Sequence, residues 1–150
     1  MSHFATIKLG LTGSPDDMKC ALVRMGFKAD MIETHNVRSD IFDISGKTQG
    51  KGAHLIVRAR HVGSASNDIG FERMADGSWD AHISDFDRGV RKDAQGNVIG
   101  QVGRYGTIWQ NRLKGYNALG KIYGWAGASK WTERQEVKEG KTYVYVEVTR

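Results

Sequence analysis

Apolar residues recur with two different periods along this chain, and the order of those periods constrains the fold more than any other feature. Near the start, Ala5, Ile7, Leu9 and Leu11 occupy alternate positions, which is the pattern of a half-buried strand. A helical pattern follows, then a group of extended segments, a second helical pattern and a closing pair of extended segments. This order predicts an α+β fold, in which an antiparallel sheet carries two helices on one face.

The split β-α-β arrangement of ferredoxin-like folds, with added loop insertions, is the nearest named pattern for this order. The chain has 150 residues and shows neither an internal repeat nor a linker-like segment. That length suits one ordinary domain with a sizeable core. We therefore expect residues 1–150 to form a single α+β domain.

The two helices are predicted over residues 15–25 and 107–125. Ser14 suits an N-cap, Pro15 the first helical turn, and Gly26 the position just after the helix. Three glycines in the second helix each cost about 1 kcal/mol relative to alanine, so packing must stabilise it. The buried faces are predicted from residues spaced three or four apart: Met18, Ala21, Leu22 and Met25, and then Trp109, Leu113, Tyr116, Gly120 and Tyr123.

The extended segments are separated by residues that favour turns. Strands are predicted over residues 29–35, 41–44, 53–62, 68–74 and 79–83, with an excursion at 98–102 and a closing hairpin over 131–148. Ala75-Asp76-Gly77-Ser78 is a strong turn signal between two of these strands. The composition of residues 45–52, SGKTQGKG, predicts a flexible loop.

Several motifs that would carry chemistry are incomplete. Ser45-Gly46-Lys47-Thr48 resembles the end of a phosphate-binding loop, but Ile41 stands where that motif needs glycine. Cys20 is the single cysteine, so the chain has no internal disulfide and no cysteine pair for zinc. Five histidines show no spacing that brings them together on one strand face: His3, His35, His54, His61 and His82. We expect neither a metal nor a cofactor.

Positive charge is concentrated in one part of the sequence. The chain carries 22 lysines and arginines against 17 acidic residues, a net charge of +5. Between Asp93 and Glu133 there is no acidic residue, whereas that interval contains five basic and six aromatic residues. Basic residues release counterions from phosphates, and aromatic rings stack on unpaired bases. The interval is therefore the strongest candidate for a binding surface.

We predict that the chain is a non-enzymatic binding protein that contacts nucleic acid or another anionic ligand. Helical geometry directs Trp109, Leu113, Tyr116 and Tyr123 toward the core, so they are left out of the predicted surface. The candidate binding residues are Arg104, Tyr105, Lys114, Lys121, Trp125, Lys130 and Trp131, with Lys47 and Lys51 from the loop 45–52.

Two alternative functions remain open. Trp125 and Trp131 could anchor a protein partner, which would make the chain an interaction or regulatory adaptor. A small enzyme could be centred on His82 and Asp85, although turn residues with solvated neighbours explain that cluster as well. No residue is assigned a catalytic role from the sequence, and the oligomeric state is left open.

The sequence also bears on the cellular compartment. No apolar run approaches the roughly 18 residues of a membrane span, so we expect no membrane association. The first residues have no signal-peptide pattern, and the cysteine content is low. We expect a cytoplasmic protein.

Three short motifs resemble a family of uncharacterised proteins, a domain of unknown function found in bacteria, plastid genomes and phages. They are Met1-Ser2-His3-Phe4 with Thr6-Ile7, then Asp68-Ile69-Gly70-Phe71, and the Tyr116-containing helix followed by a hairpin that turns at Gly140. The resemblance implies a small α+β domain in which residues 85–104 and 45–52 are insertions. It implies no activity, but it places His3 in a recurrent N-terminal signature and makes a phage-encoded regulator one form of the adaptor hypothesis.

Overall fold

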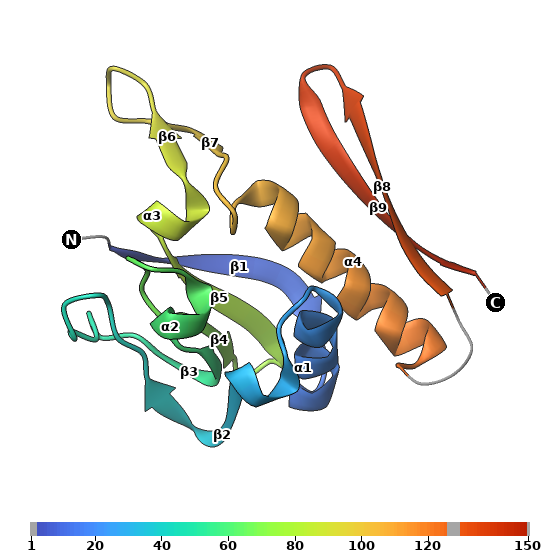
Figure 1. Cartoon of the computed structure of the whole chain (residues 1–150), viewed down its shortest axis with the longest axis horizontal. Coiled ribbons are helices and arrows are strands. Elements are labelled where there is room, and N and C mark those ends of the chain that lie inside the picture. The colour runs from blue at the N-terminus through green and yellow to red at the C-terminus, as the bar shows by residue number, and fades with distance from the viewer. Residues whose placement is uncertain (1–2, 126–129, 150) are drawn as a thin grey trace.

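The computed structural model describes residues 3–125 and 130–149, and Figure 1 shows the arrangement of the elements. Met1 and Ser2 of the N-terminal motif lie outside these residues. In chain order the elements are β1 (Phe4–Thr12), α1 (Pro15–Arg24), the 3-10 turn η1 (Ala29–Met31), β2 (Ile32–Asp40), β3 (Gly52–Val57), α2 (Ala59–Val62), β4 (Ile69–Arg73), β5 (Ser78–Ser84), α3 (Asp85–Arg88), β6 (Val90–Lys92), β7 (Val98–Gln101), α4 (Thr107–Tyr123), β8 (Lys130–Lys138) and β9 (Lys141–Thr149).

Five strands form one antiparallel sheet in the order β1-β5-β4-β3-β2. Strands β2 to β5 follow each other as a meander, and β1 pairs with β5 at the far edge. The α+β class and the antiparallel sheet predicted from the sequence are confirmed. The sheet order is not that of the split β-α-β pattern, because the strands after α4 form a separate β8–β9 ribbon instead of entering the sheet.

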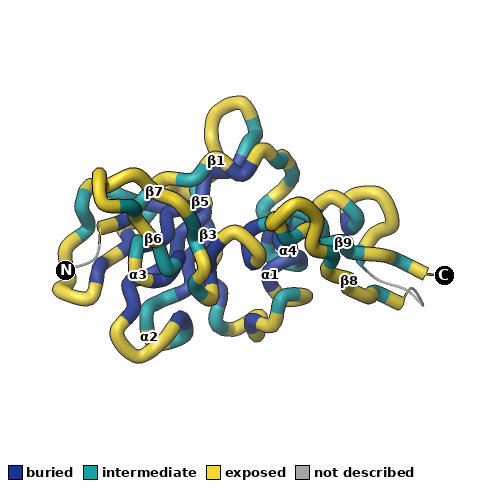
Figure 2. Tube along the Cα trace, turned by 90° about the horizontal axis from the view of Figure 1, so that it is seen from above, coloured by how far each residue is buried: buried dark blue, intermediate teal, exposed yellow. Residues whose placement is uncertain are grey.

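Helices α1 and α4 cover one face of this sheet, as predicted. One apolar cluster joins Met18 and Leu22 of α1, Leu113 of α4, and the sheet residues Phe71 and Trp79. Figure 2 shows these buried segments in the middle of the molecule, whereas the β6–β7 and β8–β9 hairpins are largely exposed. Burial of this apolar surface supplies the main favourable term in folding.

Helix α1 begins and ends where local side chains predict. Ser14 Oγ accepts the Asp17 backbone N–H at 3.1 Å, and the Asp17 carboxylate accepts the Ser14 N–H at 3.4 Å. This reciprocal capping box satisfies two donors that the first turn leaves without helical partners. Gly26 follows the helix at a φ of 114°, a conformation that side chains disfavour.

The glycines of α4 have a packing role. A Cβ atom at Gly115 would come within 2.7 Å of Val146 in β9, and one at Gly120 would overlap the Trp125 ring. The glycines that weaken the isolated helix therefore let β9 and Trp125 approach it closely. The predicted apolar stripe is buried through Gly120, but Tyr123 is 40% exposed.

Two strand predictions are wrong, and Asp68 explains both. The strand predicted over 53–62 ends at Val57, and α2 follows, because the Asp68 carboxylate accepts the Ala59 N–H at 2.8 Å. The same carboxylate accepts the Phe42 N–H at 2.8 Å, so residues 41–44 form a loop instead of pairing as a strand. The strand predicted over 29–35 begins later, at Ile32.

Candidate functional site

The segment before α4 directs two neighbouring side chains in opposite directions. After the β6–β7 hairpin the chain returns to α3, where the Gly103 N–H donates to the Arg88 carbonyl at 2.8 Å and the Tyr105 N–H donates to the Asp87 carbonyl at 3.1 Å. Gly89 and Gly103 allow this approach, since a Cβ on either would contact the backbone of the other segment. Arg104 is left exposed, and Tyr105 is buried with 2% exposure.

Two cavities share Arg104 and Tyr105 in their walls, and we call them together the Arg104 groove. The first, about 350 Å³, lies between the end of α1 and the start of α4. The second, about 300 Å³, lies between the loop 63–66 and α3. The first cavity is within the size range of small-molecule sites, and the second is at its lower limit.

Aromatic rings form the floor of the first cavity. Phe27 and Tyr105 are stacked, with ring centroids 6.3 Å apart and an interplanar angle of 8°. Trp109 meets the Tyr105 ring edge-on at 5.2 Å. The Tyr105 hydroxyl donates to the Val62 carbonyl at 3.2 Å, and burial raises the pKa of this hydroxyl. Tyr105 thus anchors the floor and does not present its ring to solvent.

The arginines at this groove differ in whether they already have an ion-pair partner within the protein. Arg112 is paired with Glu133, with 2.7 Å between Nε and Oε1. The Arg104 guanidinium lies 5.4 Å from the centroid of the Tyr105 ring, and among the described residues no carboxylate lies within ion-pair distance of it. His61 also lines the first cavity. Arg104 is therefore the cation here that can accept an anionic ligand without losing an internal ion pair.

The remaining residues predicted from the basic-aromatic interval do not join Arg104. Trp125 and Trp131 stack on each other 5.6 Å apart, and the Trp125 Nε1–H donates to Asp17 Oδ1 at 2.9 Å. Lys121 donates to the Thr12 carbonyl at 2.8 Å. Lys114 is partly buried on α4, and Lys130 is exposed at the start of β8. Trp125 and Trp131 thus join α4, α1 and the β8–β9 ribbon, and Lys121 joins α4 to the end of β1.

Lys47 and Lys51 lie on the other side of the sheet. Their loop folds around Asp43, whose Oδ1 accepts the Lys47 N–H at 3.0 Å. Hydrogen bonds to this carboxylate hold the pKa of Asp43 well below its usual range. Lys51 Nζ donates to the Thr6 hydroxyl at 3.1 Å. The predicted surface is thus divided between two faces of the molecule.

The enzyme hypothesis paired His82 with Asp85, and the structure does not bring their side chains together. The Asp85 carboxylate is paired with Arg88. His82 instead contacts Thr6 and Glu72, which lie on other strands of the sheet. Asp85, although close to His82 in sequence, is therefore not its partner, because strand pairing decides which side chains lie beside a buried residue of a sheet.

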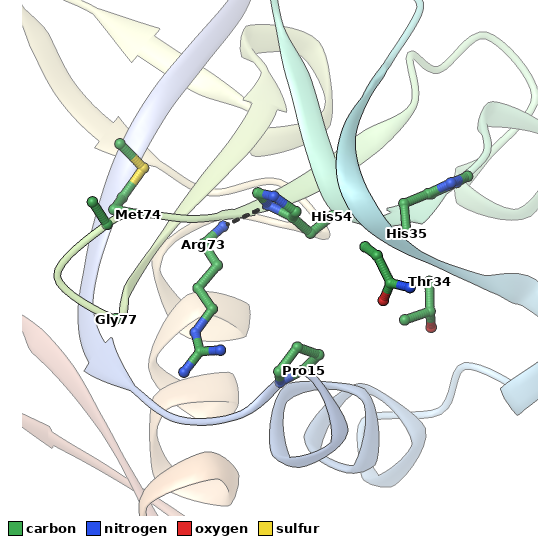
Figure 3. Close-up of a pocket in the computed structure, with 9 residues that line it drawn as sticks. Pro15, Thr34, His35, His54, Arg73, Met74 and Gly77 are labelled. Atoms are coloured by element: carbon green, nitrogen blue, oxygen red, sulfur yellow. Dashed lines mark hydrogen bonds between the residues drawn. The ribbon is translucent and has the colours of Figure 1, made fainter.

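A larger cavity, about 550 Å³, lies beside the start of α1. Figure 3 shows Arg73 extending from the end of β4 toward Pro15, with His54 above it and Thr34 across the cavity. The Arg73 N–H donates to His54 Nδ1 at 3.0 Å. Of the described residues that line this cavity, none belongs to the binding surface predicted from the sequence.

Sequence reasoning missed the residues that complete the Arg104 groove, namely Phe27, His61 and Trp109. Phe27 and His61 lie far from residue 104 in the chain, and no local pattern connects them with it. Trp109 was correctly assigned to the core, and its ring also lines the cavity. Among the described residues, no three histidine, cysteine or acidic side chains are grouped as metal ligands, and no helix is long and apolar enough to cross a membrane.

Comparison with known proteins gives no family for this chain. It matches no family model, no curated protein and no solved structure. The resemblance to an uncharacterised family therefore stays a prediction, and function has to be argued from the geometry of the site.

Proposed function

We propose that this protein binds a nucleic acid or another phosphate-bearing ligand at the Arg104 groove. The observation that carries the proposal is Arg104 itself, an exposed guanidinium between two cavities with no ion-pair partner among the described residues. A guanidinium offers two parallel N–H donors, a geometry that matches phosphate oxygens.

The surroundings of Arg104 favour an anion over a cation. His61 and Arg112 line the same cavity, and no described acidic side chain lines it. Phe27, Tyr105 and Trp109 line the same cavity, so the exposed margins of these buried rings give an apolar wall beside Arg104 against which part of a ligand, such as the edge of a base, can rest. A phosphate at Arg104 with a base toward the floor suits a single-stranded segment or a nucleotide better than an intact duplex.

The adaptor hypothesis has less support. It required Trp125 and Trp131 to be exposed anchors, but both rings are partly buried and stacked on each other. Interface anchors contribute most when their surface becomes buried on binding. Surface that is already packed within the chain contributes little to such an interface.

Fluorescence anisotropy with labelled single- and double-stranded oligonucleotides, at low and at physiological salt, tests the proposal. We expect the single strand to bind more tightly and its affinity to fall steeply as salt rises. Arg104→Gln should weaken binding, whereas Arg91→Gln, an equal loss of charge on an exposed residue of β6, should not. Absence of binding at low salt, or equal losses in the two variants, would overturn it.

A further inference from the structure

A chain of hydrogen bonds crosses the sheet on the face opposite α1 and α4. His82 of β5 is 3% exposed, with its Nδ1 3.0 Å from the Thr6 hydroxyl oxygen and its Nε2 2.9 Å from Glu72 Oε1. Glu72 Oε2 in turn accepts from Arg38 Nε at 3.1 Å. We call Thr6, His82 and Glu72 the His82 relay. It lies apart from the Arg104 groove and does not depend on it.

Strand pairing determines the geometry of the relay. Thr6 of β1 is directly opposite His82 in the register of β1 and β5. On the other side of β5, His82 faces Gly70, which has no side chain, so Glu72 can reach the imidazole from two residues along β4. All three backbones belong to paired strands, and groups held on strands are positioned more accurately than groups on loops.

The direction of each hydrogen bond follows from the chemistry of the partners. An ionised carboxylate can only accept, so Glu72 requires the imidazole proton on Nε2. Nδ1 is then the free acceptor, and the Thr6 hydroxyl donates to it. Burial lowers the pKa of His82, although Glu72 opposes this shift, so the ring is neutral at physiological pH. A neutral imidazole that accepts a hydroxyl proton is arranged as a general base.

The charged groups around the relay act on the hydroxyl and on the ring. Lys51 Nζ donates to the Thr6 hydroxyl oxygen at 3.1 Å, so it would stabilise negative charge on that atom. Asp80 also faces this side of β5, and its carboxylate lies 3.9 Å from Lys8 Nζ. Thr6 is exposed while His82 is buried, so the hydroxyl is the member of the relay that a substrate can reach.

We propose that Thr6 is a nucleophile and that the His82 relay hydrolyses small carboxylic esters through an acyl intermediate. Thr6 Oγ1 attacks the ester carbonyl carbon while its proton passes to His82 Nδ1. The ester C–O bond breaks, and Nδ1 returns the proton to the departing alcohol oxygen. Water then attacks the acyl–Thr6 ester, gives a proton to Nδ1 and releases the acid, and that proton restores the Thr6 hydroxyl.

The test uses 4-nitrophenyl acetate as the probe, with release of nitrophenolate followed at short times and the acetylated residue located by peptide mass spectrometry. We expect an initial burst and an acetyl group on Thr6. Thr6→Val should abolish both, and Thr6→Ser should retain them. Thr142→Val, a change of the same kind on the β8–β9 ribbon, should leave the rate unchanged.

A second set of measurements tests His82 without relying on one variant of a buried residue. His82→Asn should slow the burst by about 100-fold, and Glu72→Gln should slow it less. In the unchanged protein the burst rate should rise with pH to a plateau whose midpoint lies below 6.5, because only the neutral ring accepts the proton. Acetylation of lysines alone, a rate that keeps rising above about pH 9 as for amines, or no reaction would overturn the proposal.

Discussion

Two clusters in this molecule combine arginine with aromatic rings, and they use those residues differently. One cluster, which we call the Trp131 stack, is formed by Arg24, Tyr116, Trp125 and Trp131. The centroid of the Trp131 ring lies 5.7 Å from that of Tyr116, 5.6 Å from that of Trp125 and 4.9 Å from the Arg24 guanidinium. In the Arg104 groove the rings are buried, and the Arg104 guanidinium, 5.4 Å from the Tyr105 centroid, makes no side-chain hydrogen bond to another described residue.

The difference shows that composition alone does not identify a binding surface. Arg24 donates to the Trp125 carbonyl at 3.3 Å, so binding an anion there would compete with an existing contact. Neither arginine has an ion-pair partner among the described residues, but Arg104 has no such hydrogen bond to lose when a phosphate approaches. Both guanidiniums are exposed and lie over a ring, so it is the hydrogen bond to Trp125, and not exposure, that distinguishes Arg24 from Arg104.

The largest expected effect is on stability. Trp131→Ala should lower the free energy of unfolding by about 2–3 kcal/mol, less than the roughly 3–5 kcal/mol of a fully buried tryptophan, because Trp131 is only partly buried. Arg104→Ala should change it by less than about 0.5 kcal/mol. Urea denaturation of both variants measures the difference, and equal losses would mean that the two clusters are not functionally distinct.

The next effect is on binding. Arg104→Gln should weaken oligonucleotide affinity about 10-fold, which corresponds to ~1.4 kcal/mol, because one charge-assisted contact to phosphate is removed. Arg24→Gln removes the same charge from the Trp131 stack and should leave the affinity nearly unchanged. Anisotropy titrations at one salt concentration give both values. A larger loss for Arg24→Gln would place the ligand on the stack instead.

A smaller effect is expected at Lys121, which lies near the C-terminal end of α4. Lys121→Met should lower the free energy of unfolding by about 1 kcal/mol, because the ammonium donates to both the carbonyl and the hydroxyl of Thr12. Lys114→Met on the same helix is the control and should cost less than about 0.5 kcal/mol. Thermal or urea unfolding distinguishes them, and similar losses would contradict a tethering role for Lys121.

The smallest expected effect is on how the stability of the protein depends on pH. The hydrogen bond from Trp125 is the largest cause that lowers the pKa of Asp17 below 3.8. A lowered folded-state pKa stabilises the protein above 3.8, and this contribution is lost as the pH falls through the folded-state value. Trp125→Phe should therefore make the urea midpoint fall less between about pH 6 and about pH 3. Trp109→Phe, which does not contact Asp17, should keep the original dependence.

Elements with strong local signals could be predicted from the sequence. The start of β1, the helix α1 with its Ser14 cap, the turn at Gly77 and the hairpin that turns at Gly140 all follow from residues close together in the chain. Predictions failed where a distant side chain forms a hydrogen bond with the backbone, as the Asp68 carboxylate does with the N–H groups of Phe42 and Ala59. Strand propensity could not reveal this competition, because Asp68 is 26 residues from Phe42 along the chain.

For the candidate site, the sequence pointed to the basic-aromatic interval and to Arg104 within it. Nothing local distinguished Arg104 from Lys121, since both are cations near aromatic residues. Their difference comes from Thr12, which meets Lys121 across 109 positions of the chain and has no counterpart at Arg104. In the same way His82 was identified from sequence, but its partners Thr6 and Glu72 were not.

Where caps, turns and apolar periods give strong signals over a few residues, local interactions decide which segments of this chain become helices and strands. The order of the sheet, the burial of Tyr105, the stacking of Trp125 on Trp131 and the Thr6–His82–Glu72 contacts are decided only in the folded molecule. Each of these depends on which distant side chains fill the neighbouring space, and close packing at interior density restricts that choice.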